Sequence, residues 1–214
     1  MKMNKKKLAV VSLLLCIAAI ISMGSLAWFT ASDSVTNTLS FVTDFSMQVY
    51  ETDVDGVTKH VVNNDNVGWD YLNLMPNQVI HKDPTVQNMS SSEAQWIKVA
   101  VTVDKYSTWK NVVAEGSDLT SIFKEFDASA WSLYGAPAVN AANDTITYTY
   151  ILNCALPAGQ TATLFKSVQI PSAITVEQAA TLSGSKIIID AEALQVSELG
   201  KTNAKDAWDL VAAN

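Results

Sequence analysis

The sequence predicts an all-β protein, an antiparallel β-sandwich of two sheets with short flanking helices. Two observations lead to this prediction: hydrophobic and polar residues alternate over several segments, and turn signals separate these segments at short intervals. The clearest strand covers residues 94–104, in which Ile97, Val99, Val101 and Val103 share one face. Such alternation is typical of an antiparallel sheet with one face on the core and the other in water.

Trp96 falls on the opposite, outward face of this strand. Exposed there, its indole would offer a surface for stacking against a sugar ring. The alternative is that a loop or a flanking helix covers the side chain, as is common for large aromatic residues.

Further strands are expected in seven segments with turn signals between them. Asp55-Gly56 predicts a hairpin and Pro76-Asn77 predicts a turn. Pro84 indicates an edge position for its strand, because proline cannot donate a hydrogen bond to a neighbouring strand. The expected strands cover residues 39–49, 57–62, 78–88, 131–134, 145–154, 161–170 and 186–196.

Two helices are expected beside the strands. Residues 119–126 carry a hydrophobic stripe with helical spacing, and Ser117 or Asp118 can cap this helix. Residues 203–212 form a terminal helix with Asn203 as its cap.

The first 27 residues differ in composition from the rest of the chain. Four lysines precede an apolar run from Leu8 to Met23, a pattern typical of a secretory signal peptide. The run is shorter than the roughly 20 apolar residues that span a bilayer comfortably. Ser25 and Ala27 are the small residues that a signal peptidase requires, so the mature chain is expected to begin at Trp28. An uncleaved N-terminal anchor is the alternative.

Cleavage leaves residues 28–214 as a single domain, and its charge excludes some partners. Ten basic residues, all lysine, and 21 acidic residues lie after position 27, a formal charge of −11. Nucleic acids are therefore excluded as partners, because binding phosphates requires clustered positive charge. The mature domain is expected to be soluble outside the cell, with no stable membrane span.

No catalytic motif is found, so the protein is not expected to be an enzyme and no catalytic or cofactor-binding residue is predicted. His60 and His81 lie 21 residues apart, and neither belongs to an HExxH zinc motif. Asp53 and Asp55 begin like a calcium loop, but the later glutamate of an EF-hand is missing. Weak calcium or zinc binding by these residues stays open as an alternative. Cys154 is expected to be a small buried hydrophobic residue.

Four groups of motifs, spread over nearly all of the mature chain, carry a family resemblance. They are Gly24–Thr30 with Asn37–Phe41, Met75–Val79 with Lys82–Asn88, Leu156–Phe165 with Val168 and Pro171, and Ala191–Gln195 with Ala207-Trp208. In this order they resemble the signal cleavage site and strands of the TasA/camelysin family. Asn77 replaces the usual glycine of the family's turn, and asparagine can adopt the left-handed conformation that such a turn needs.

The resemblance implies a jelly-roll-like sandwich, cleavage by a dedicated signal peptidase, and assembly into extracellular fibres of a bacterial biofilm matrix. The partners would be copies of the same chain or related fibre subunits, in the extracellular matrix or at the cell surface. Two alternatives stay open: an accessory, anchoring or adhesin protein of the same fold, and a camelysin-like metalloprotease.

The mature N-terminus, residues 28–41, is a candidate donor strand. A sandwich has unpaired backbone groups at its edges, and a terminal segment can pair with such an edge on a neighbouring copy. Head-to-tail contacts of this kind propagate into filaments. The alternative is that these residues form an ordinary first strand of the chain's own domain, and this alternative is favoured for Leu39 and Phe41. The residues expected to make donor-strand contacts are Trp28, Phe29, Val35, Leu39 and Phe41.

Overall fold

The structure is a computed structural model that describes residues 30–33, 45–52, 59–61, 71, 74–113 and 117–213. No helix among these residues is long and apolar enough to cross a membrane. Several predicted features lie outside the described residues: the signal peptide (1–27), the cleavage-site residues Ser25, Ala27 and Trp28, the assembly residues Phe29, Val35, Leu39 and Phe41, the Asp55-Gly56 turn, and the candidate ligands Asp53 and Asp55.

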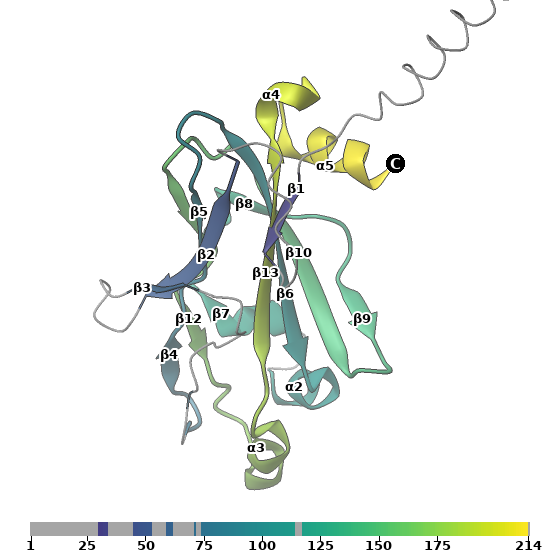
Figure 1. Cartoon of the computed structure of the whole chain (residues 1–214). Helices are drawn as coiled ribbons and strands as arrows, with labels where there is room; N and C mark the ends of the chain where they lie inside the picture. Colours follow the sequence, from purple (N-terminus) through teal and green to yellow (C-terminus); the bar gives the residue numbers. More distant parts are fainter. Residues whose placement is uncertain are drawn as a thin grey trace, which may run out of the picture.

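One layer of the sandwich is a six-stranded antiparallel sheet (Figure 1). Its order is β1-β13-β6-β10-β8, and β9 pairs with β10 as well. The long strands β6, β10 and β13 confirm three of the predicted strands to within two residues. The bounds are β1 Thr30–Asp33, β13 Ile187–Gln195, β6 Gln95–Asp104, β10 Thr145–Leu152, β8 Trp131–Leu133 and β9 Ala138–Asn140.

The second layer consists of two shorter sheets, ordered β11-β5-β2-β3 and β4-β12-β7. Every strand pair in them is antiparallel. The β2-β3 pair confirms that the segment after the predicted hairpin returns antiparallel. The bounds are β11 Thr161–Thr163, β5 Thr85–Asn88, β2 Met47–Thr52, β3 Lys59–Val61, β4 Val79–His81, β12 Ser167–Gln169 and β7 Phe123–Lys124.

These two short sheets share one register across a break. His81 pairs with Ser167, and Thr85 pairs with Thr163, so three residues interrupt each of the two chain segments. Backbone hydrogen bonds still cross the interruption, from Lys82 N to the Lys166 carbonyl and from Leu164 N to the Pro84 carbonyl. The second layer is therefore one ladder with a local interruption, and the all-β sandwich predicted from the sequence is confirmed.

The core lies between the layers and consists of the inward faces of both. Val99, Val101 and Val103 of β6 are each at most 1% exposed, as their alternation predicted. They pack in one cluster with Val86 of β5 and with Phe165, whose ring stacks on Phe123 at a centroid distance of 4.6 Å. This continuous hydrophobic cluster is what holds the two layers together.

Short helices flank the sandwich, as predicted. They are α2 Tyr106–Val112, α3 Val176–Leu182, α4 Val196–Leu199 and α5 Ala204–Ala212, with a 3₁₀ helix η1 at Leu119–Ile122. The terminal helix α5 is confirmed, and the Asn203 side chain accepts a hydrogen bond from Asp206 N at 2.9 Å, as a cap does. The sequence did not predict α2 or α3.

Helix α5 covers part of the outer face of the six-stranded sheet, and this decides between the two interpretations of Trp96. Trp96 does lie on the outward face of β6, but it is only 4% exposed. It belongs to a second hydrophobic cluster with Leu194 and with Trp208 of α5. Lys98 extends from the same face, with its Nζ 4.2 Å from the centroid of the Trp208 ring. Trp96 is therefore a packing residue and offers no stacking surface for a sugar.

Four further predictions need correction. The expected helix 119–126 ends at Ile122, because Phe123 enters β7, although Asp118 does cap it through Thr120 N. The expected strand 161–170 is two strands, β11 and β12. The expected edge strand 78–88 is two strands on either side of Pro84: β4 lies at an edge of its described sheet, as expected, but β5 is internal, between β11 and β2. Cys154 is exposed, because β10 ends two residues before it.

Candidate functional site

Strand β1 lies at one edge of the six-stranded sheet (Figure 1). Within the part of the chain that the structure describes, its four residues pair with one strand, β13, from Thr30 opposite Leu194 to Asp33 opposite Ala191. Thr30 follows the predicted cleavage site by three residues. Of the candidate donor segment, residues 30–33 are therefore the part that the structure describes, and they form an edge strand within their own domain.

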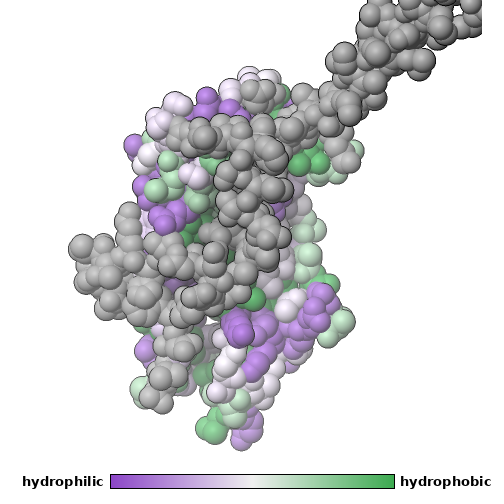
Figure 2. Space-filling model, in the orientation of Figure 1, coloured by the Kyte–Doolittle hydropathy of each residue, from purple (hydrophilic) through white to green (hydrophobic). Residues whose placement is uncertain are grey.

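Some large hydrophobic residues are exposed on the described surface. On the face shown in Figure 2, hydrophobic residues appear as small separate spots among hydrophilic ones. Leu74, Met75 and Val79 are exposed in one segment around the turn before β4, whereas Val139 in β9 and Val176 in α3 come from separate elements. Isolated residues of this kind are normal on a protein surface.

A polar cluster occupies the break in the second layer. Thr52, the last residue of β2, donates its backbone N–H to Asp83 Oδ1 at 2.7 Å and its hydroxyl to Asp83 Oδ2 at 2.5 Å. Its hydroxyl oxygen lies 3.0 Å from His81 Nε2, and His81 Nε2 lies 3.4 Å from Asp83 Oδ1. The Asp83 side chain thus accepts a hydrogen bond from the Thr52 N–H just beyond the point where the β2-β5 ladder ends.

Next to this cluster lies a buried ion pair that the sequence did not predict. Glu51 and Lys82 are 6% and 7% exposed, and their charged atoms are 2.5 Å apart. Tyr71 donates its hydroxyl to the His81 carbonyl at 2.5 Å. Burial raises the pKa of Tyr71, and the charges of Glu51 and Asp83 raise it further. The phenol is therefore a permanent hydrogen-bond donor at neutral pH.

The candidate metal ligands are only partly brought together. His81 lies beside Asp83, and His60 is in β3, paired in register with Glu51. Among the described residues, no group of three or more His, Cys, Asp or Glu side chains is placed to hold a metal ion. A zinc site normally requires at least three protein ligands. The described part of this cluster therefore works as a hydrogen-bonded and ion-paired seam between strands.

A second buried polar group closes the other end of β5. Asn88, which is fully buried, donates to the carbonyls of Glu93 and Leu156 at 2.8 and 2.9 Å. Gln95, also fully buried, donates to the carbonyl of Ser46 at 3.0 Å. Asn88 ties the end of β5 to the loops at Glu93 and Leu156, and Gln95 ties the start of β6 to the loop at Ser46. Both side chains satisfy backbone groups that the strands leave unpaired.

Comparisons of the chain with models of known protein families, with curated proteins and with solved structures found no match.

Proposed function

We propose that this protein is a secreted structural protein, a subunit of extracellular biofilm-matrix fibres that assemble by β-strand addition. Residues 1–27 direct export, and a dedicated signal peptidase removes them after Ala27. The observation that supports the proposal most directly is the position of β1, a four-residue edge strand close to the start of the mature chain. The motifs that resemble the TasA/camelysin family support the extracellular location and the fibre. In this proposal the protein has no catalytic role.

Strand β1 is suited to exchange between copies. In the structure it pairs with β13 of its own chain, and the same register can form with β13 of a second copy. Residues 34–46 join β1 to β2, and thirteen residues reach at most about 45 Å when extended. A domain of this size measures about 40 Å across. The donated strand can therefore reach the edge of an adjacent copy.

Exchange of this strand leads to an open filament. Each copy has one donor, β1, and one acceptor edge, on β13, and these are different surfaces. When the exchange runs head to tail and does not close into a swapped dimer or a ring, each added copy leaves a free donor at one end and a free acceptor at the other. Backbone hydrogen bonds to β13 provide the affinity, as in other cases of β-strand addition.

Cysteine cross-linking between copies tests the exchange. Ser32 and Glu192 are opposite each other in the β1-β13 register. Their Cβ atoms are expected about 5 Å apart, close enough for a disulfide after a small adjustment. Ser32→Cys and Glu192→Cys are made as separate proteins in a Cys154→Ser background, which removes the exposed thiol. Mixed under assembly conditions and oxidised, they should form heterodimers linked between the two variants.

The matched control pairs Ser32→Cys with Ala138→Cys, an exposed position in β9 on the other side of the sheet. This control should give no specific cross-link. Cross-linking of the control at the same rate, or a disulfide found only when both cysteines are on one chain, would refute strand exchange.

Electron microscopy tests the fibre itself. Mature protein, residues 28–214, should form regular filaments with a repeat near the length of one domain, and removal of residues 28–36 should prevent their formation. Filaments that form unchanged without these residues would contradict the donor-strand mechanism. A persistent monomer of the intact mature protein would contradict the function as a fibre subunit.

A further inference from the structure

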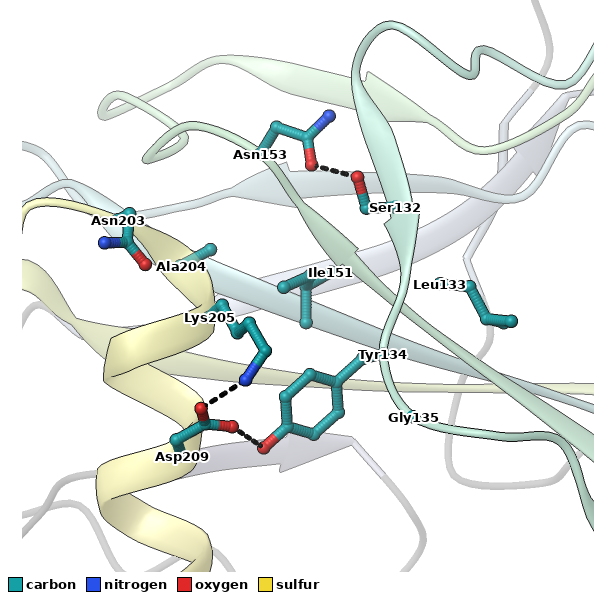
Figure 3. A pocket seen from close by; sticks show the side chains of 10 residues that line it. All are labelled: Ser132, Leu133, Tyr134, Gly135, Ile151, Asn153, Asn203, Ala204, Lys205 and Asp209. Carbon is teal, nitrogen blue, oxygen red and sulfur yellow. Dashed lines mark hydrogen bonds and ion pairs between the residues drawn. The ribbon is translucent and has the colours of Figure 1, made fainter.

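A groove lies between helix α5 and strand β8, on the outer face of the six-stranded sheet (Figure 3). Its volume is about 560 Å³, within the range of roughly 300–1,000 Å³ that is usual for small-molecule sites. The apolar part of its lining comes from Tyr134 at one end and from the small exposed parts of Ile151 in β10 and Ala204 in α5, which are 5% and 2% exposed. Figure 3 shows Leu133 pointing away from the helix.

Hydrogen bonds fix the polar side chains of the groove in place. At one end, Tyr134 donates its hydroxyl to Asp209 Oδ1 at 2.9 Å, and Lys205 Nζ donates to Asp209 Oδ2 at 2.5 Å. At the other end, Ser132 donates its hydroxyl to Asn153 Oδ1 at 2.6 Å, and Asn153 Nδ2 donates to the Ser129 carbonyl at 3.0 Å. A site whose side chains are already ordered loses less entropy when a ligand binds.

These groups keep hydrogen-bonding capacity for a ligand. Lys205 has three N–H donors and uses one of them on Asp209, and each Asp209 oxygen accepts only one of these two bonds. Ser132 and Asn153 are both exposed. Donors and acceptors therefore lie along both walls, beside an aromatic ring.

The charges in the groove favour an uncharged ligand. Lys205 and Asp209 neutralise each other, and the mature chain as a whole carries a formal charge of −11. A polyanionic ligand would be repelled by this net charge. A ligand with many hydroxyl groups, weakly polar faces and no charge matches both the hydrogen-bonding groups and the tyrosine ring.

We infer that this groove binds a neutral saccharide, with a sugar ring against Tyr134 and with its hydroxyls bonded to the two polar ends. Such binding would link fibres, or single copies, to the neutral polysaccharide around them. This inference does not depend on filament formation, since the groove and β1 lie on different elements.

Backbone amide NMR of the mature protein tests the inference. Three neutral tetrasaccharides serve as probes: cellotetraose, laminaritetraose and tetra-N-acetylchitotetraose. At least one should shift the amides of Tyr134, Gly135, Asn153 and Lys205 in a saturable manner. Tetragalacturonic acid, the charged counterpart, should bind at least about tenfold more weakly.

Two variants and a matched control separate the groove from the rest of the surface. Tyr134→Ala should weaken the affinity about tenfold by removing the aromatic wall. Tyr106→Ala, at a similarly half-buried tyrosine in α2, should leave it unchanged. Ser132→Trp, at an exposed position, should fill the groove and abolish binding even if Tyr134→Ala does not fold. The inference is wrong if no neutral probe shifts these amides, if Ser132→Trp binds normally, or if tetragalacturonic acid binds as tightly as the best neutral probe.

Discussion

The buried pair Glu51–Lys82 allows a sharp prediction about stability. Both residues are more than 90% buried, and their charged atoms are in direct contact. Lys82→Met removes the positive charge and leaves the Glu51 carboxylate in the interior without its partner. The loss of one member of a buried pair typically reduces the free energy of unfolding by about 3–5 kcal/mol. This is a large part of the total stability of an ordinary domain, about 5–15 kcal/mol.

Replacement of both members should have a very different effect. In Glu51→Leu/Lys82→Met, two hydrophobic side chains of similar size replace the ions, and neither charge has to be removed from water on folding. Such replacements are often neutral, or stabilising by about 1–4 kcal/mol. We therefore expect the double variant to be at least as stable as the wild type, and about 3 kcal/mol or more above the single variant.

Urea unfolding followed by tryptophan fluorescence measures these differences. Lys166→Met is the matched control, because Lys166 and Glu125 are 3.6 Å apart and each 63% exposed. Its cost should be at most about 1 kcal/mol, as for other surface pairs. Two results would refute the claim that Lys82 compensates the buried charge of Glu51. One is a loss of less than about 1 kcal/mol in the free energy of unfolding for Lys82→Met, and the other is a double variant as unstable as this single variant.

Three further predictions concern other elements. Trp208→Ala should cost about 3–5 kcal/mol in urea unfolding, because this side chain is 1% exposed and carries the contact of α5 with the sheet; a cost under about 1 kcal/mol would contradict that role. Asn77 has φ = 64°, so Asn77→Gly should leave the melting temperature nearly unchanged, whereas Asn77→Val should destabilise by about 1–2 kcal/mol; equal melting temperatures would be inconsistent with a left-handed turn. Hydrogen bonds from Lys205 and from Tyr134 lower the pKa of Asp209. Its ionised form therefore stabilises α5 at neutral pH, and this contribution disappears as the pH falls through the lowered pKa. NMR titration should show a higher pKa for Asp209 in Tyr134→Phe, and an unchanged value would speak against the hydrogen bond.

The alternation of hydrophobic and polar residues predicted the long strands, and the Asn203 cap indicated the terminal helix. Both signals are local, because they reflect which side chains of one segment are buried and how that segment begins. The valines of β6 are inside, and Asn203 caps α5, as expected. The turn at Asn77 is also confirmed, with a hydrogen bond from Gln78 N to the Met75 carbonyl at 3.1 Å. Each of these features depends on residues close together in the sequence.

The features that the sequence left open or predicted wrongly depend on contacts between distant segments. The sequence offered both an exposed and a covered Trp96, and α5, which covers it, lies more than a hundred residues away. The ladder break was invisible because Thr163 to Ser167 continue a strand-like pattern, while Asp83 uses its side chain to bond Thr52. The groove brings together three segments, 132–135, 151–153 and 203–209. The paired register of β8 and β10 places the first two side by side, and the packing of α5 on the sheet adds the third.

The ladder break also limits how the chain can change in length. Residues 82–84 on one strand face residues 164–166 on the other, so both sides of the interruption contain the same number of residues. A single-residue insertion or deletion on one side would shift the register beyond it by one position. That shift would turn Val86, which is 2% exposed, from the core to the outside of the sheet. Length changes at this point should therefore be tolerated only in matched pairs, one on each strand.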